Sequence, residues 1–375
     1  MAVIRKKKSF GKSLKAAAVK NKPSDQPLWK GPWEDGITQS LLNLFLICRE
    51  RFRLKVIEGW SLADTFNHRL EYGSMWHVCE EEYARTKGAD DNWQRALLDY
   101  CKGLSSRYKE SREQILHWYN VCKLQFPIYL EHWKKHPDQR QKKMIYAEQT
   151  FSVPYRLPSG RSVRLRGKWD GVDWIGKGKA AGIYLQENKT KGEINEEGLK
   201  RQLSFDLQTM FYLTALSLWE EFPSDKLAGV RYNVIRRPLA GGKHSISQRK
   251  GRETKTGLVG AETPEEFYAR LGEEIKGDPE FFFMRWTVEV SREDIIKFRR
   301  QFLDPILEQL CDWWEWIIAA PEGEFRPCDH GIHFRTPYGI YNPLAEGRTT
   351  DLDDYLMTGS TTGLVKADRL FKELD

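Results

Sequence analysis

The chain has 375 residues, of which 40% are hydrophobic and 13% aromatic, so it can bury a sizeable core and is neither fibrous nor globally disordered. No apolar run reaches the roughly 18 residues that a membrane-spanning helix needs, because the longest candidate, 41–48, is interrupted by Asn43 and followed by charged residues. The net charge of +7 favours a polyanionic partner, although an ordinary cytosolic enzyme could carry the same charge.

The chain begins with a basic segment. Residues 1–24 contain eight lysines and arginines, with little apolar periodicity and without the apolar core of a secretory signal. We interpret residues 1–30 as a flexible arm that either aids solubility or tethers nucleic acid. A nuclear-import signal is a third interpretation of the same charges.

Helices are expected over most of residues 37–135. Leucine and phenylalanine recur at helical spacing in 38–57, and Gly59 ends this first helix. A second helix is expected over 62–86, and two more lie within 92–134, which is rich in Leu, Tyr and Trp. The first third of the chain is therefore predicted to be helical.

The pattern changes at Met144. Residues 146–155 and 162–174 have the composition of strands and are joined by a turn at 157–160. Residues 183–190 form the next expected strand. Three consecutive strands with short connections predict an antiparallel meander.

Helices and strands mix after the meander. A helix is expected over 203–221, and a long one runs from its N-cap Ser291 to about residue 318. Strands are expected over 229–236 and 281–290, separated by a polar loop. Within that loop, the basic segment 240–260 is interpreted as a disordered surface loop, as a flap that contacts DNA, or as both at once.

Together these elements predict one domain over residues 31–320. It consists of a helical part, 37–135, and an α/β core, 144–320, and residues 321–375 are a C-terminal extension. The six cysteines are widely scattered and form no CxxC pair, which indicates free thiols in a reducing, cytoplasmic compartment.

The strand 183–190 carries the first candidate for chemistry, Glu187-Asn188-Lys189. Side chains alternate along a strand, so Glu187 and Lys189 share the face that begins with the core residues Ile183 and Leu185. Burying charges there costs several kcal/mol unless they are paired or bind a metal. Alone, a Glu–Lys pair at a strand end is more often a solvated edge than a catalytic pair.

A second carboxylate changes this interpretation. Asp170 lies seventeen residues before Glu187 on the preceding strand, so the two acids come within reach of each other. Carboxylate and water oxygens suit Mg²⁺. Lys189 could orient or deprotonate the attacking water and offset charge on a phosphate. These three residues are the minimum set for metal-assisted phosphodiester hydrolysis.

At this point the sequence resembles a known family. Gly167 and Asp170, then Glu187-Asn188-Lys189, then Gln208 and Tyr212 follow the order found in RecB-type nucleases of the PD-(D/E)XK superfamily. Gln208 and Tyr212 are four residues apart and therefore neighbours on one helix face. Ordinary surface packing is the alternative explanation for that pair.

Two upstream segments extend the resemblance to residues 37–237. Gly73–His77 resembles the start of the family's Gly-x-x-x-His helix, where the histidine completes the metal site. Glu81, one turn further along, could orient that histidine. Ser40–Phe52, followed by Gly59, resembles the family's opening helix.

The resemblance implies a restriction-endonuclease-like α/β fold, with a mixed central sheet flanked by helices and a helical N-terminal elaboration. Asp173 could replace Asp170 only if Gly171 forms a bulge, because otherwise it faces the other way. The implied site takes Mg²⁺ or Mn²⁺, and its metal ligands are His77, Asp170, Glu187 and the backbone carbonyl of Asn188. The implied catalytic residues are Asp170, Glu187, Lys189 as base or stabiliser, Gln208 and Tyr212.

Some relatives hold an iron–sulfur cluster on four cysteines. Cys48 occupies the upstream place and Cys328 can mark a downstream one, but the other two cysteines are missing and only His330 and His333 lie nearby. We therefore expect no iron–sulfur cluster. The aromatic run 313–316 could stack bases, although packing in the core is the favoured interpretation.

The implied function is that of a metal-dependent deoxyribonuclease, with exonuclease favoured over endonuclease, acting on single-stranded DNA or duplex ends in recombination, replication or repair. The expected setting is the cytoplasm of a bacterium or a phage-infected host, and the source could be a phage or mobile element. The sequence has no GxxxxGK[ST] phosphate loop, so unwinding would come from a helicase or recombination partner; no membrane partner is expected. The alternatives are a catalytically inactive DNA-binding module on the same fold and a structural or packaging-associated protein.

Overall fold

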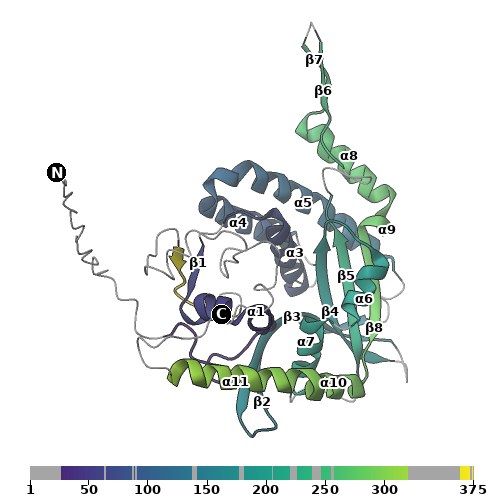
Figure 1. The fold of residues 1–375 in the computed structure, drawn as a ribbon. Coiled ribbons are helices and arrows are strands. Elements are labelled where there is room, and N and C mark those ends of the chain that lie inside the picture. Colours follow the sequence, from purple (N-terminus) through teal and green to yellow (C-terminus); the bar gives the residue numbers. More distant parts are fainter. Residues whose placement is uncertain are drawn as a thin grey trace, which may run out of the picture.

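The computed structural model of the chain describes residues 27–62, 65–86, 88, 91–136, 142–176, 181–204, 206–219, 226–238, 246–254, 257–319, 364–371 and 374. Its centre is a five-stranded sheet with the strand order β2-β3-β4-β5-β8 (Figure 1). The strands of this sheet are β2 (Lys142–Arg156), β3 (Ser162–Ile175), β4 (Gly182–Lys191), β5 (Leu227–Arg236) and β8 (Phe283–Glu289).

The sheet is mixed. Strands β2, β3 and β4 form the predicted antiparallel meander, whereas β5 runs parallel to β4 and antiparallel to β8. The parallel step needs a crossover, which contains α6 (Glu196–Leu203) and α7 (Leu207–Ser217). One helix was predicted over 203–221, but the chain forms two helices, because α6 ends at its C-cap Ser204 and Asp206 caps a new helix, α7.

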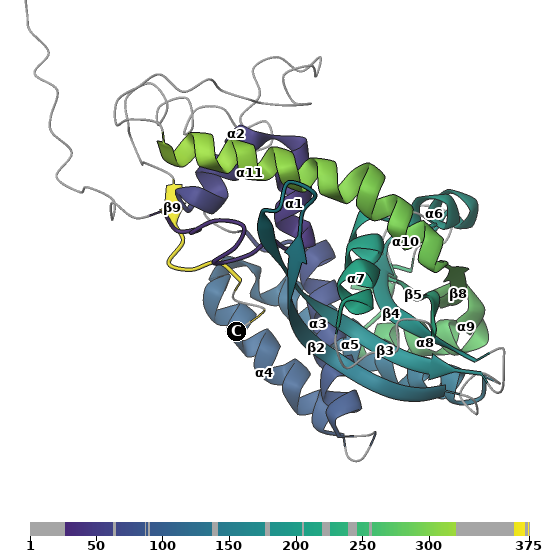
Figure 2. The ribbon, with the colours of Figure 1, turned by 90° about the horizontal axis from the view of Figure 1, so that it is seen from below.

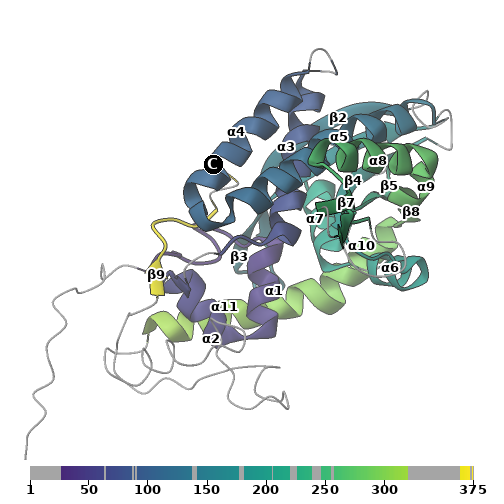
Figure 3. The ribbon, with the colours of Figure 1, turned by 90° about the horizontal axis from the view of Figure 1, so that it is seen from above.

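Helices cover both faces of the sheet, and successive side chains of β5 divide between them. Val234 belongs to the hydrophobic core shared with the helices that Figure 2 shows in front of the sheet: α1 (Gln39–Ile47), α7, α10 (Arg292–Phe298) and α11 (Asp304–Ala319). Ile235 belongs to the core on the other face, which lies in front in Figure 3. Its helices are α3 (His68–Arg85), α4 (Asn92–Arg107), α5 (Arg112–Lys134), α8 (Pro264–Gly277) and α9 (Pro279–Phe282). The predicted α/β class, a mixed sheet flanked by helices with a helical N-terminal part, is confirmed.

Two helices that were predicted as continuous are interrupted. Residues 38–57 form α1, then α2 (Arg49–Phe52) and a π-helical turn, η1 (Arg53–Ile57), because Cys48 is extended with φ −160°. The long C-terminal helix contains a π-helical turn, η6 (Arg299–Leu303), between α10 and α11. Its predicted N-cap is confirmed, since Ser291 and Asp294 form a reciprocal capping box.

The segment predicted as a polar loop between 236 and 281 contains regular structure. Strands β6 (Lys250–Thr254) and β7 (Gly257–Ala261) form a hairpin that projects beyond α8 (Figure 1). Helix α8 follows, capped by Thr263 and Glu266. The loop prediction was wrong for these residues, and residues 239–245 lie outside the described part of the chain.

The ends of the described chain pack against the domain. Trp29 lies on the arm side of the expected boundary at residue 30 but is fully buried, so the packed chain begins before that boundary. In the C-terminal extension, β9 (Leu364–Lys366) pairs with β1 (Trp60–Leu62). A short 3-10 helix, η2 (Lys109–Ser111), links α4 to α5. Among the described residues, no helix combines the length and apolarity needed to cross a bilayer.

Candidate active site

Strand β4 brings three of the predicted residues into direct contact. Lys189 Nζ lies 2.7 Å from Glu187 Oε1 and donates a hydrogen bond of 2.7 Å to Gln208 Oε1 on α7. Gln208 Nε2 in turn donates to Glu187 Oε1 at 2.8 Å. The carboxylate, ammonium and amide therefore form a closed triangle, as the strand alternation predicts for Glu187 and Lys189.

Asp170 lies on the neighbouring strand next to this triangle. Gly171 of β3 pairs with Gln186 of β4 as the last pair of their register, and Asp170 and Glu187 are the next residues on the two strands. Asp170 Oδ2 accepts a hydrogen bond of 2.8 Å from the backbone N–H of Asn188. The two predicted acids thus lie side by side on adjacent strands.

His77 reaches the same place from α3. Its Nδ1 is 3.7 Å from Asp170 Oδ1 and 3.8 Å from Glu148 Oε1. The candidate ligand atoms of these three residues all lie within 4.8 Å of one another, a spacing that suits a metal ion. The structure therefore brings the predicted histidine to the predicted acids and adds a third carboxylate.

Glu148 is a residue that the sequence analysis missed. It lies in β2 between two pairs of the β2–β3 ladder, Ala147 with Gly171 and Gln149 with Trp169, and so is opposite Asp170. Its φ of 48° is left-handed, which is costly for a residue with a side chain and is concentrated at functional sites. Lys168 Nζ lies 2.9 Å from its other oxygen. Neither sequence spacing nor composition marks this residue.

The cluster leaves carboxylate oxygens that a cation would satisfy. Glu148 Oε1 and Glu187 Oε2 are buried, and neither has a hydrogen-bond partner within the described part of the chain. An unsatisfied buried carboxylate oxygen is costly. Carboxylate oxygens with one imidazole nitrogen form a donor set that suits Mg²⁺ or Mn²⁺. The residues present therefore fit a divalent cation.

Burial and neighbouring charges act in opposite directions on the pKa values of the site. Burial raises the pKa of Glu187 to about 7, although Lys189 opposes that shift. Burial also raises the pKa of Asp170, against the effect of His77. For His77, burial lowers the pKa, but the carboxylates of Asp170 and Glu148 outweigh it and raise the pKa to about 10. Crowded acids that hold protons until a cation replaces them are typical of a metal site.

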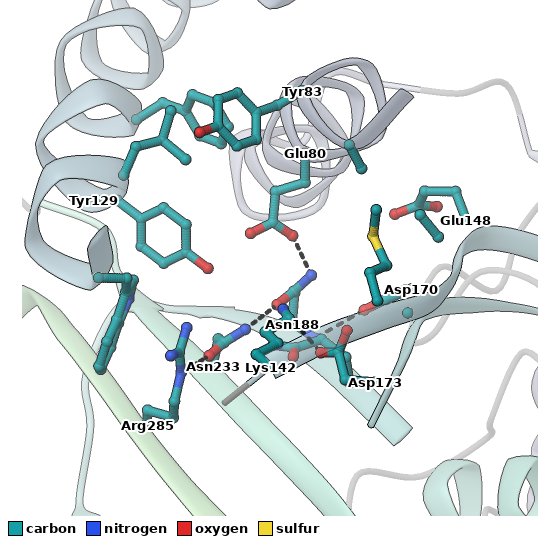
Figure 4. A pocket seen from close by; sticks show the side chains of 18 of the residues that line it. Glu80, Tyr83, Tyr129, Lys142, Glu148, Asp170, Asp173, Asn188, Asn233 and Arg285 are labelled. Atoms are coloured by element: carbon teal, nitrogen blue, oxygen red, sulfur yellow. Dashed lines mark hydrogen bonds and ion pairs between the residues drawn. The ribbon is translucent and has the colours of Figure 1, made fainter. Parts of the chain in front are cut away.

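A polar network on the other face of β4 holds Asn188 in place (Figure 4). The Asn188 side chain donates to Glu80 and accepts a hydrogen bond of 2.7 Å from Asn233 Nδ2. Arg285 Nε then donates to Asn233 Oδ1 at 2.5 Å. This network fixes the residue whose backbone carbonyl is a predicted ligand. Sequence reasoning chose Glu81 as the supporting acid of α3.

The structure places Glu81 elsewhere. Its side chain is 49% exposed and contacts Lys168 at 2.9 Å, so it lies beside the lysine that binds Glu148. Glu80, one residue earlier, is the acid that faces β4. The difference is a rotation of about 100° around the helix axis, which residue spacing alone does not determine.

Two motif glycines allow close packing around the site. A Cβ at Gly167 would lie 2.6 Å from Phe151 and 3.0 Å from Tyr212. A Cβ at Gly73 would lie 3.3 Å from Thr190, where α3 crosses the end of β4. Tyr212 lies over Gly167 and packs edge to face with Phe151, 5.5 Å between ring centroids, so it contacts the strand that carries Asp170. Its partner Gln208 contacts the charged pair directly.

Asp173 lies three residues after Asp170 on β3 and is engaged by a different partner. Residues 171–175 pair in unbroken register with β4, so Gly171 forms no bulge there. Asp173 is buried and lies 2.8 Å from Lys142 Nζ. The condition under which it could replace Asp170 is therefore not met.

The remaining predicted features lie away from this cluster. Cys48 and Cys311 are buried free thiols, whereas Cys328 and the nearby histidines lie outside the described residues. Trp313 packs against Phe45 at 5.5 Å between ring centroids, as expected for core packing. Trp316, three residues on, is 44% exposed.

Comparisons with known proteins agree with this geometry. A family model, described as PD-(D/E)XK nuclease superfamily, matches residues 37–298, which is well over half of the chain and contains the whole site. No curated protein sequence gives a significant match. The mixed sheet with flanking helices is consistent with the restriction-endonuclease-like fold of that superfamily. The chain therefore belongs to the PD-(D/E)XK nuclease superfamily.

Proposed function

We propose that this protein is a Mg²⁺- or Mn²⁺-dependent deoxyribonuclease of the RecB type, with exonuclease favoured over endonuclease activity. The observation that carries the proposal is the convergence of Asp170 and Glu187 from adjacent strands, with Lys189 beside them and His77 opposite. Nucleases of this superfamily generally use divalent metals, and the unsatisfied oxygens of Glu148 and Glu187 support that use here.

The residues that would hold the ion are His77, Glu148, Asp170, Glu187 and the backbone carbonyl of Asn188. When bound, a divalent cation polarises the phosphate and lowers the pKa of a bound water. Asp170 and Glu187 would hold it from two adjacent strands, and the hydrogen bond from the Asn188 N–H fixes one oxygen of Asp170. The hydrogen-bonded sheet therefore fixes the positions of the two carboxylates relative to each other.

The proposed role of Lys189 is to stabilise, as an ammonium, the negative charge that develops on the phosphate. Burial lowers its pKa, but Glu187 outweighs that effect, and the net shift is upward. The side chain is therefore an ammonium at neutral pH, and Glu187 and Gln208 hold it at 2.7 Å each. A fixed ammonium can donate a hydrogen bond to a phosphate oxygen as negative charge develops there.

The biological setting is proposed on the same basis. The resemblance favours DNA recombination, replication or repair on single-stranded DNA or duplex ends, in a phage or mobile-element context. Because the sequence lacks a phosphate loop, a helicase or recombination protein would supply unwinding. Buried free cysteines are in keeping with the cytoplasm of a bacterium or a phage-infected host.

The test compares the wild type with Asp170→Ala and Lys189→Ala on end-labelled single-stranded and duplex DNA, in Mg²⁺, Mn²⁺ or EDTA. We expect cutting by the wild type only with metal, and loss of cutting in both variants, with circular dichroism showing that they remain folded. An inactive DNA-binding module would instead bind DNA in a salt-dependent way without cutting it. Undiminished cleavage by either variant would overturn the proposal.

A further inference from the structure

A pocket of about 430 Å³ lies directly beside the candidate metal site (Figure 4). Asp170 and Glu148 line it, together with residues of α3, α5 and all five strands of the sheet. Its volume is within the range of pockets that enclose small molecules. A chemical group in this pocket would be adjacent to a phosphate held at the metal site.

The walls of the pocket suit a flat group with hydrogen-bonding edges. One wall consists of aromatic side chains, and the other presents amides of the sheet. Stacking and edge hydrogen bonds together are how proteins hold planar polar rings. The aromatic residues are Tyr83, Phe126, Tyr129 and Trp133, and the amides are Gln186, Asn188 and Asn233.

The charges of the pocket disfavour an anion. Its carboxyl groups belong to Glu80, Glu148, Asp170 and Asp173. Two of the lining cations are already engaged, because Lys142 pairs with Asp173 at 2.8 Å and Arg285 lies 3.7 Å above the ring of Trp133. A phosphate would meet more negative than free positive charge here. A neutral group is the better match.

Several buried polar atoms of the pocket lack partners. Gln186 is 8% exposed, and its Oε1 has no hydrogen-bond partner in the described part of the chain. Arg285 Nη1 and Trp133 Nε1 are also buried without a hydrogen-bond partner in the described part of the chain. Unsatisfied buried polar atoms are costly. A neutral ring with hydrogen-bonding edges offers the kind of partner that such atoms lack.

We propose that this pocket receives one unpaired nucleobase of the DNA strand whose phosphate lies at the Asp170–Glu187 site. The inference rests on the proposed function, because it is the nuclease substrate that brings a base and a phosphate together. A base in the pocket must leave the duplex stack. The substrate class is therefore single-stranded DNA or a frayed duplex end rather than intact duplex.

Photocrosslinking tests the pocket without relying on cleavage. A single-stranded oligonucleotide with one 4-thiothymine is irradiated with the full chain, in EDTA and in Mg²⁺, and the crosslinked peptides are identified by mass spectrometry. We expect crosslinks to peptides that contain Tyr83, Tyr129, Trp133 or Met144, which line the pocket. Crosslinks confined to other peptides, or none at all, would refute the pocket.

Two variants sharpen the result. Gln186→Met keeps the side-chain length and removes the amide, so crosslinking should fall by about 2- to 10-fold, the worth of one hydrogen bond. Gln114→Met, an exposed position on α5, is the matched control and should behave as the wild type. Equal yields from Gln186→Met and the wild type would contradict the assigned role of the amide.

A cleavage assay tests the pocket independently of crosslinking. On a single-stranded oligonucleotide with one abasic residue, wild-type cutting should drop by about 5- to 100-fold at one fixed offset from the missing base, because a stacked base is lost. Cutting that ignores the abasic residue would refute the pocket and leave the nuclease assignment standing. Crosslinks in the pocket without cutting of any DNA would refute the nuclease assignment and support the pocket.

Discussion

The two faces of β4 carry different chemistry within the same few residues. Glu187 and Lys189 point towards α7 and form a charged triangle with Gln208. Gln186 and Asn188, which alternate with them, point to the pocket under α3 and α5. On the first, the charged face, a carboxylate and an ammonium contact each other. On the second, the amide face, Asn188 and Asn233 are bonded to each other and to the charged side chains of Glu80 and Arg285.

The difference shows why the spacing Glu-x-Lys is useful. The period of two along a strand puts both charged groups on one side and leaves the intervening residue free to anchor the backbone on the other. Asn188 uses that freedom, since its side chain bonds to Glu80 and Asn233 while its N–H bonds to Asp170. The side chain of Asn188 thus fixes the backbone between the two charged residues.

The largest expected effect is the loss of cleavage when the charge of Lys189 is removed. Lys189→Met keeps the length of the side chain and removes its charge, so cleavage should fall by about 10²–10³-fold, as when one transition-state donor is lost. Binding of Mn²⁺ should stay unchanged or tighten, because a cation next to the ion disappears. Single-turnover cleavage and Mn²⁺ titration followed by electron paramagnetic resonance measure the two effects.

Lys102→Met is the control for that variant, since Lys102 lies on α4 and pairs only with exposed Asp99 among the contacts described. It should retain full activity. If Lys189→Met weakened Mn²⁺ binding as strongly as cleavage, Lys189 would be maintaining the site rather than stabilising the reaction.

Breaking the amide face should affect stability first. Asn233→Leu leaves Asn188 Oδ1 and Arg285 Nε without their partner, which should lower the free energy of unfolding by about 1–3 kcal/mol. Urea unfolding of the metal-free protein measures this loss, with exposed Asn92→Leu as the control. A variant as stable as the wild type would show that the network does not support the fold.

Glu148 tests where the charged face ends. Glu148→Gln keeps the shape of the side chain and removes its charge, so Mn²⁺ affinity should fall by about tenfold, while the fold is retained. Isothermal titration calorimetry measures the change, and Glu274→Gln, at an exposed position of α8, should leave the affinity unaltered. An unchanged affinity in Glu148→Gln would restrict the site to the residues of β3, β4 and α3.

The charged face was largely predictable from the sequence, because it depends on short-range rules. Strand alternation put Glu187 and Lys189 together, and a short connection put Asp170 on the next strand. Resemblance to a family added His77 and Gln208, and the structure brings both to the same cluster. Their roles remain the subject of the experiments above.

Glu148 and the amide face depend on information that the sequence pattern does not contain. Glu148 meets Asp170 only through the register of β2 and one left-handed residue. Asn233 and Arg285 come from strands far along the chain, and the parallel pairing of β4 with β5 was not foreseen. Helix α8 was a different failure, since its buried residues Phe267, Leu271 and Ile275 have a helical spacing that was available in the sequence.

The smallest expected effect is a pH dependence of metal binding, which should come from the charged face and not from the amide face. Burial raises the pKa of Glu187 to about 7, and the carboxylates of Asp170 and Glu148 outweigh burial to hold His77 at about 10. A carboxyl with a raised pKa favours the folded state while protonated, so its contribution to the stability of the metal-free protein is lost as pH rises through about 7.

Metal binding needs these groups deprotonated. The rise in Tm on adding Mn²⁺ should therefore be larger at pH 8 than at pH 6, by a few degrees at most, in differential scanning fluorimetry. Burial raises the pKa of Glu80 to about 7 as well, against the effect of His77, but its carboxylate is bonded to Asn188 and is not one of the residues that would hold the ion. Glu80→Gln should consequently keep the pH dependence of the metal effect, whereas a Tm gain independent of pH in the wild type would show that Glu187 and His77 do not exchange protons for the ion.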